Sequence, residues 1–192
     1  MATSAMVTTT QRPVTEDPDI IKPDSLEAWL ENPLDGTEWV DGQLVEKVGM
    51  TLTHSKIQGN LYYCWRRYQE ENNLGGQTYT EVPCQTKKQG RKPDVAYLTQ
   101  ELLDKYGEPK TLPQSFPLSA EVVSPSDLAE DVYEKADEYL ESGGEEVWLI
   151  FPENHRVVVI TSTTEQTFKS GEVAKTQVAL PGFEVSIDEL LA

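Results

Sequence analysis

Two acidic residues stand where strand-like segments should be buried. The segment LSAEVVS, residues 118–124, carries Glu121 in an otherwise apolar run. Asp94 stands at the start of the second such segment, PDVAYL. A buried ionised carboxylate costs a large free energy unless a positive group compensates it. We therefore expect a cation close to both acids.

The helix expected after the Glu121 strand supplies a candidate cation. Helical spacing places Lys135 in the apolar stripe of this helix, together with Val132 and Tyr139. The short SPSD turn between strand and helix brings its ammonium group within reach of Glu121. A lysine in such a position forms a structural ion pair or serves catalysis, and the spacing fits both interpretations.

Two carboxylates on adjacent strands form a site of hard oxygen ligands, which suits Mg²⁺ or Mn²⁺ better than zinc. The backbone carbonyl of Val122 could add a third ligand. A metal ion there would activate a bound water and neutralise phosphate charge, while the ammonium of Lys135 would orient the water or stabilise developing negative charge. These groups together are those that phosphodiester hydrolysis requires.

Two further sets of residues are candidates for accessory roles. His54 falls on the apolar face of a helix expected over residues 53–72, where most histidines are structural and a role in the site is the alternative. The segment KKQGRK holds four basic side chains: Lys87, Lys88, Arg91 and Lys92. Such a segment is typical of a solvated loop or hairpin tip, and the alternative is a phosphate-binding patch.

Three helices are expected besides a short one at the end of the chain. Asp24 and Glu27 form a capping-box pattern before the short helix of residues 25–32. Asp127 with Glu130 forms another, before the helix that carries Lys135 and runs to about residue 142. The segment 99–117 is expected to be a loop with at most one helical turn, because it holds several prolines.

The remaining periodic segments are strands, and they define the fold class. An Asp-Gly pair at residues 41–42 predicts a hairpin, since both residue types tolerate positive φ. Strands before, between and after two substantial helices predict an α/β (α+β) fold, with a mixed sheet flanked by helices.

Composition restricts the class of protein further. The chain has 192 residues and a net charge of -17, with 16 basic and 33 acidic side chains. This length fits one domain, expected over residues 24–192, after a flexible tail over residues 1–23. No apolar run is long enough to cross a bilayer. Two cysteines, Cys64 and Cys84, are too few for a disulfide framework, so we expect a cytoplasmic protein.

Several motifs resemble the Uma-two family of restriction-endonuclease-like proteins, within the PD-(D/E)XK nuclease superfamily. They cover roughly residues 24–192 and read DGQLVEKVGMTLTHSKIQGNL, RKPDVAYL, AEVVSPSD, KADEYLESGGEEVWLIFPENHRVVVI and LPGFEVSIDELL. The resemblance implies a restriction-endonuclease-like core in which Asp94 and Glu121 bind Mg²⁺ or Mn²⁺. Glu46 is then the upstream acid of the same site.

The resemblance also implies a role for Lys135. The superfamily usually places its lysine two residues after the second acid, where this chain has Val123. The relatives that this chain is most similar to place the lysine on the following helix, which corresponds to Lys135. His54 matches a position that these relatives often fill with histidine.

Three functions remain as hypotheses. The first is a metal-dependent endonuclease acting on DNA, with local contacts that overcome the acidic net charge. The second is a nuclease-like fold without catalysis, serving as a binding or assembly module, with a homodimer as one form. This hypothesis gains support from the net charge of -17, because DNA affinity depends on phosphate contacts. The third, a metal-free glycosidase with two carboxylates, requires an aromatic sugar cleft, whereas Trp29, Trp39, Trp65 and Trp148 fall at expected core positions.

Overall fold

The computed structural model describes residues 12–13, 22–47 and 50–192. Within these ranges the α-helices are α1 (Leu26–Glu31), α2 (Leu52–Glu71), α3 (Gln100–Tyr106), α4 (Ala129–Glu141) and α5 (Ile187–Leu191), with a 3-10 helix at Pro152–Asn154. The strands are β1 (Arg12–Pro13), β2 (Thr37–Val40), β3 (Gln43–Glu46), β4 (Gln77–Thr80), β5 (Cys84–Gln85), β6 (Gly90–Arg91), β7 (Val95–Leu98), β8 (Leu118–Val122), β9 (Glu146–Phe151), β10 (Arg156–Thr161), β11 (Glu165–Lys169), β12 (Val173–Lys175) and β13 (Glu184–Ser186).

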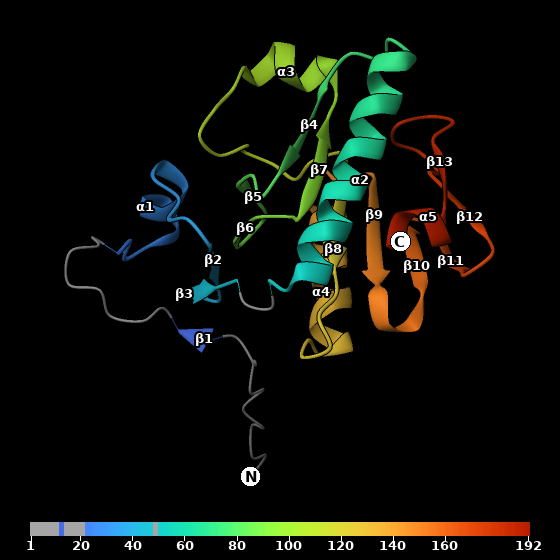
Figure 1. Ribbon diagram of the computed structural model, residues 1–192. Helices are drawn as coiled ribbons and strands as arrows, with labels where there is room; N and C mark the ends of the chain where they lie inside the picture. Colours follow the sequence, from blue (N-terminus) through green and yellow to red (C-terminus); the bar gives the residue numbers. More distant parts are fainter. Residues whose placement is uncertain (1–11, 14–21, 48–49) are drawn as a thin grey trace.

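The central sheet contains six of the described strands, in the order β11-β10-β9-β8-β7-β4. Neighbouring strands are antiparallel except β8 and β9, which run parallel because α4 connects them as a crossover. Helices lie on the faces of this sheet (Figure 1). The predicted fold class, a mixed sheet flanked by helices, is therefore confirmed.

Helices α2 and α4 contribute to two different hydrophobic cores, one on each face of the central sheet. Buried side chains of α2 pack with those of the strands and of α5, and they include Ile57, Leu61 and Trp65. Buried side chains of α4 pack with the opposite set of strand residues, and they include Val132, Ala136 and Tyr139. The direction in which a strand residue points therefore decides which helix it meets.

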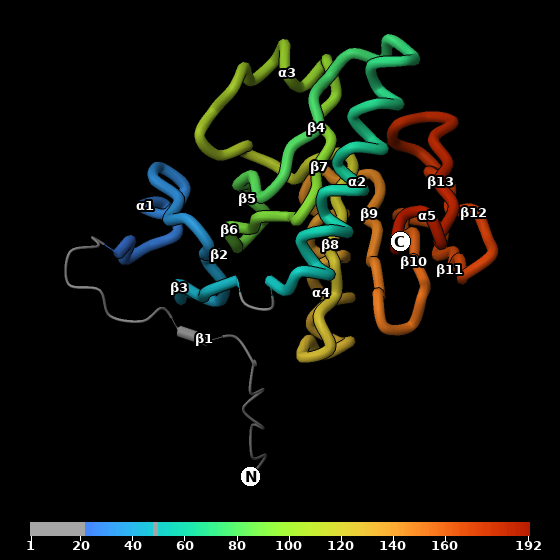
Figure 2. Tube along the Cα trace, viewed as in Figure 1, coloured from blue at the N-terminus to red at the C-terminus, as the bar shows by residue number. Residues whose placement is uncertain are grey.

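A smaller sheet brings a hairpin to the beginning of α2. Its described strands have the order β1-β3-β2-β6-β5, and β6 leads directly into β7 of the central sheet (Figure 2). The turn between β2 and β3 is the predicted Asp-Gly pair, with φ of 50° at Asp41 and 78° at Gly42. The hairpin prediction is confirmed, because β2 pairs with β3 on either side of this turn.

Both predicted capping boxes are wrong, although both helices exist. Ser25, not Asp24, caps α1, because its hydroxyl accepts a hydrogen bond from a backbone N–H of the first turn. At α4 the N-cap residue is Leu128, whose side chain makes no capping bond. The Asp127 carboxylate instead accepts a hydrogen bond from the N–H of Ser124 at 2.8 Å, and this bond closes the SPSD turn. Helix α3 is also longer than the single turn expected in its loop.

The aromatic core agrees with the sequence prediction, since all four tryptophans are buried. The predicted tail, residues 1–23, lies outside the described residues except for Arg12–Pro13 and residues 22–23. Arg12–Pro13 pair with β3 as the short strand β1. No helix in the described part of the chain is long and apolar enough to cross a membrane.

Candidate metal centre and active site

Glu121 points towards α4 from the middle of the central sheet. Its neighbours in β8, Ala120 and Val122, belong to the core beneath α2, so alternation turns Glu121 to the other face. The residue is 9% exposed. Its Oε1 accepts a hydrogen bond from the Tyr139 hydroxyl at 2.7 Å and lies 3.0 Å from Lys135 Nζ. Burial raises the pKa of Glu121 to about 7, because the Lys135 ammonium offsets only part of the desolvation.

Asp94 directly precedes β7 and lies beside the same part of β8, because Val95 pairs with Ala120. Asp94 is 1% exposed, and its Oδ2 accepts a hydrogen bond from Val122 N at 2.7 Å. Its Oδ1 lies 2.8 Å from Lys47 Nζ. Burial by itself would raise the pKa of Asp94, but the Lys47 ammonium outweighs it and holds the pKa well below its usual range.

Lys135 reaches the site from α4, as its place in the apolar stripe predicted. Its Nζ lies 3.0 Å from Glu121 Oε1 and 3.0 Å from Glu38 Oε1. Its side chain is 15% exposed. Burial by itself lowers the pKa of Lys135, but these two carboxylates raise it above the ordinary value, so the amine stays charged. The predicted approach of Lys135 to Glu121 is confirmed.

Glu38, from β2, connects Lys135 to a second cation. Its Oε2 lies 3.2 Å from Arg91 Nη1, and its Oε1 accepts a hydrogen bond from Lys92 N at 2.8 Å. Arg91 also binds Glu138 of α4, with Nη2 at 2.7 Å from Oε2. Burial alone would raise the pKa of Glu38, but Lys135 and Arg91 outweigh it and lower the pKa to about 2. This buried network fixes the position of the Lys135 amine.

Lys47 binds Asp94 from the opposite side. Its Nζ lies 2.8 Å from Asp94 Oδ1, 2.8 Å from Glu81 Oε2 and 2.7 Å from the carbonyl oxygen of Lys92. Gln58 of α2 supports the same group, because its Nε2 donates to Glu81 Oε1 at 3.0 Å and to the Asp94 carbonyl at 2.9 Å. Asp94 and Glu121 are therefore each paired with a different lysine.

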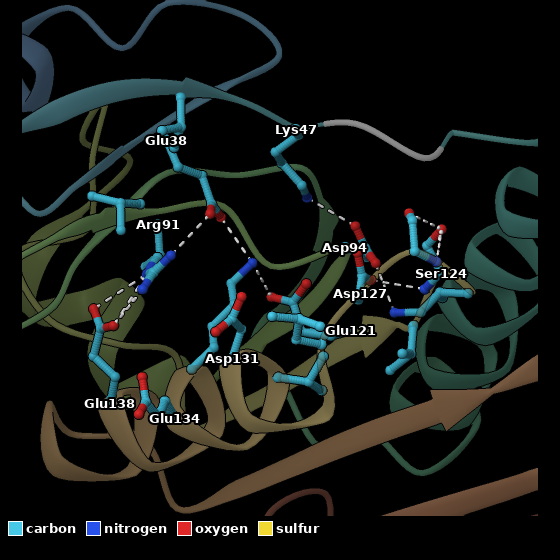
Figure 3. Close-up of a pocket in the computed structure, with 18 of the residues that line it drawn as sticks. Glu38, Lys47, Arg91, Asp94, Glu121, Ser124, Asp127, Asp131, Glu134 and Glu138 are labelled. Atoms are coloured by element: carbon cyan, nitrogen blue, oxygen red, sulfur yellow. Dashed lines mark hydrogen bonds and ion pairs between the residues drawn. The ribbon is translucent and has the colours of Figure 1, made fainter. Parts of the chain in front are cut away.

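A cavity of about 810 Å³ is lined by both acids and both lysines, together with Glu38 and Arg91. Figure 3 shows Lys47 pointing to Asp94 on one side, and Glu38 with Arg91 on the other, with Glu121 between them. The rim nearest the start of α4 is acidic and includes Asp127, Asp131 and Glu134. The cavity thus combines a charged, hydrogen-bonded floor with an exposed acidic edge.

The side chains of the cavity fit a divalent cation of the Mg²⁺ or Mn²⁺ type. Asp94 and Glu121 offer hard carboxylate oxygens from adjacent strands. His54 of α2 lies beside these oxygens: its Nε2 is buried, makes no geometrically favourable hydrogen bond to another described residue and lies 3.3 Å from Asp94 Oδ2. Burial by itself lowers the pKa of His54, but the adjacent Asp94 carboxylate raises it above the ordinary value. In its neutral form this imidazole would offer a nitrogen ligand to a divalent ion bound at Asp94.

Residues 23–188 match the model of the Uma2 protein family, which is described as "Putative restriction endonuclease". The chain belongs to the Uma2 family. A search of curated protein sequences finds no significant match.

One solved structure has a similar fold. The chain is similar to a crystal structure described as a putative nuclease belonging to DUF820 from Anabaena variabilis, with a TM-score of 0.76 and 19% identity. The alignment covers 88% of this chain and 98% of the other. At 19% sequence identity this similarity shows the fold alone. The nuclease-like classification comes from the match to the family model.

Glu46 lines the cavity, and its role as the upstream acid of the site stays a prediction. The KKQGRK segment, residues 87–92, begins in the tip of the hairpin between β5 and β6, as one interpretation predicted, and its second half includes β6 itself. Its four basic side chains do not form a single exposed patch: Arg91 and Lys92 are buried, while Lys87 and Lys88 are exposed.

Sequence reasoning missed Glu38, Lys47 and Glu81. Glu38 lies in the four-residue strand TEWV, all of which is buried, so the argument used for Glu121 could have found it. Lys47 follows the end of β3, and Glu81 lies in the loop after β4. Neither residue lies in a periodic element, so no pattern signals that it faces the site.

Proposed function

We propose that this Uma2 protein is a Mg²⁺- or Mn²⁺-dependent endonuclease that hydrolyses phosphodiester bonds of DNA. Asp94 and Glu121 would hold the metal ion, with the backbone carbonyl of Val122 as a further ligand. When bound, the ion supplies a water of lowered pKa and neutralises phosphate charge. The observation that supports this most strongly is the approach of Lys135 to Glu121, at 3.0 Å, inside the cavity that Asp94 also lines.

The chain's own residues would position and neutralise the reacting phosphate. The Lys135 amine stays charged at neutral pH, because Glu121 and Glu38 raise its pKa. An ammonium held there would orient the attacking water and stabilise negative charge that develops on the phosphate. Glu38 would act as a positioning residue, because it binds Lys135 and Arg91 together. Glu46, which lines the same cavity, and His54 would serve as accessory groups.

Exposed basic side chains outside the buried ionic groups of the cavity would bind the DNA phosphates. Lys87 and Lys88 keep the exposure that such a contact requires, although Lys87 Nζ also lies 3.1 Å from Glu141 Oε2. Arg91 and Lys92 bind protein groups instead, with Lys92 Nζ donating to the Leu34 carbonyl at 2.8 Å. The phosphate-binding part of the proposal therefore rests on the two exposed lysines.

Plasmid cleavage tests the proposal directly. We expect the purified chain to nick or linearise supercoiled DNA with millimolar Mg²⁺ or Mn²⁺, and to lose this activity with chelator. Asp94→Asn should lower the rate by about 100-fold or more, because it removes a charged ligand. Asp137→Asn, on the exposed side of α4, is the matched control and should cleave normally. Equal rates for the native protein and Asp94→Asn would refute the proposal.

A second function, a nuclease-like module that binds without cleaving, is favoured by the acidic rim of the cavity. Asp127, Asp131 and Glu134 lie at the edge that a DNA strand would have to approach, and acids there oppose phosphate. A homodimer is one form that this module would take. Calorimetric titration with Mn²⁺ separates the two functions, because only the endonuclease needs a divalent ion. Absence of binding at millimolar Mn²⁺ would favour the module.

A further inference from the structure

The ammonium of Lys47 is surrounded by oxygen atoms in the way that a bound cation would be. Its three donors meet three acceptors: Asp94 Oδ1 at 2.8 Å, Glu81 Oε2 at 2.8 Å and the Lys92 carbonyl at 2.7 Å. Two carboxylates and one backbone carbonyl are also the ligand types that Mg²⁺ and Mn²⁺ take. The Lys47 side chain is 13% exposed, so its amine is largely screened from water.

A second observation marks this place as a cation position. His54, Glu81 and Asp94 each offer one ligand atom, and these atoms all lie within 4.8 Å of one another. His54 is nine-tenths buried, and its Nε2 has no hydrogen-bond partner although it lies 3.3 Å from Asp94 Oδ2. Neutral imidazole is a common metal ligand, and the two carboxylates beside it are of the type that suits Mn²⁺. Three candidate ligand atoms therefore lie close together here.

Asp94 is shared between this position and the one proposed for the catalytic ion. Glu121 and Lys135 lie on its α4 side, whereas Lys47, Glu81 and His54 lie on its α2 side. A carboxylate shared in this way is the arrangement found in two-metal sites, whose ions lie about 3.5–4 Å apart. In this chain a lysine stands where such a site would have its second ion.

We propose that Lys47 is a built-in cation that fills the second of two adjacent cation positions, so that the native chain binds one fewer divalent ion than its ligands could hold. The inference rests on the proposed function for the first ion, which Asp94 and Glu121 would bind. The balance of charge supports it. Without Lys47, the carboxylates of Asp94 and Glu81 would lie together in a largely buried place, and such a pair needs a compensating cation.

A lysine amine is protonated and positively charged at neutral pH. The three oxygen atoms around Lys47 Nζ hold that charge in this position. The amine therefore competes with a divalent ion as a fixed positive charge. Figure 3 shows it directed at Asp94 from the end of the β3 segment.

Metal stoichiometry tests the inference, with Mn²⁺ alone as the probe. We expect isothermal titration of Lys47→Met to show one more Mn²⁺ per chain than the native protein. Electron paramagnetic resonance should show spin coupling between two ions that share Asp94. Lys47→Met with Glu81→Gln should lose the additional ion, because one carboxylate ligand is gone. Lys175→Met removes a lysine from an exposed ion pair with Glu184 and should keep the native stoichiometry.

The outcomes separate this inference from the proposed function. One ion in both the native protein and Lys47→Met would overturn the inference and leave the endonuclease proposal intact. No ion in the native protein would remove the metal from the endonuclease proposal, and one ion in Lys47→Met would then show that Lys47 occupies a single cation position and not the second of two. Lys47→Gln keeps amide donors near the three oxygens and loses the charge. If Lys47→Met fails to fold, the titration of Lys47→Gln decides, with the same gain expected.

Discussion

The two lysines of the site bind its two acids with similar distances but very different support. Lys135 extends from the middle of α4 and is fixed by Glu121 and by the buried Glu38–Arg91 pair. Lys47 follows the last residue of β3 and binds Asp94 and the partly exposed Glu81. The α4 half of the site is therefore a network of buried ion pairs, whereas the Lys47 half includes one carboxylate, Glu81, whose side chain is 33% exposed. The proposed function places catalysis in the first half, and the further inference places a built-in cation in the second.

The largest expected effect is on the α4 half. Lys135→Met should reduce plasmid cleavage by about 100- to 1000-fold, because it removes the charge that stabilises the developing phosphate anion. Single-turnover kinetics with Mn²⁺ would measure it, and circular dichroism would verify the fold. Lys56→Met, an exposed lysine of α2, is the matched control. If Lys135→Met cleaves DNA as fast as Lys56→Met, Lys135 has no catalytic role and the proposed difference between Lys135 and Lys47 is wrong.

Glu38→Gln should lower the free energy of unfolding by about 3 kcal/mol at neutral pH. This value follows from the pKa of Glu38, which its cations lower to about 2 from an ordinary value of 4.5. A lowered pKa means that the stabilisation is present above pH 4.5 and is lost as the pH falls through about 2. Urea unfolding at several pH values would measure it. A pH-independent difference between the two proteins would contradict the ionic explanation.

Glu81→Gln should cost less, about 1 kcal/mol or below, because the Glu81 side chain is 33% exposed and its ion pair with Lys47 is partly screened. The pKa of Glu81 is raised, chiefly by burial, so the neutral form is tolerated there. Urea unfolding of Glu81→Gln and of Glu38→Gln would compare the losses in free energy of unfolding that the two substitutions cause. A loss as large as that of Glu38→Gln would show that the ion pairs of the Lys47 half stabilise the protein as much as those of the α4 half.

The smallest expected effect lies outside both halves. Replacing Lys87 and Lys88 together by alanine should weaken DNA binding mainly at low salt, and should lower the slope of log affinity against log salt by about one to two. Fluorescence anisotropy with Ca²⁺ in place of Mn²⁺ would measure it without cleavage. An unchanged slope would mean that the KKQGRK tip makes no phosphate contact.

Regular elements were the part of the fold that could be predicted most closely. The helix expected over residues 53–72 is α2, Leu52–Glu71, because the apolar spacing of its buried residues is a local property. The Asp-Gly turn was predictable for the same reason. The helix caps were not, since Ser25 and Asp24 are neighbours of similar capping ability and the path of the chain selects between them.

The sequence by itself determined which charged groups needed partners. Glu121 in a buried strand and Lys135 in an apolar stripe each carry an energetic cost that can be read locally, and they pair with one another. Only the tertiary structure decided which other groups complete the site. Lys47 and Glu38 are far from Asp94 and Glu121 along the chain, and their approach depends on where the pairing of β2 with β6 places the β2–β3 hairpin. Glu81 reaches Asp94 through the pairing of β4 with β7. Placement of this kind results from many small packing terms summed over distant segments, and no local pattern records that sum.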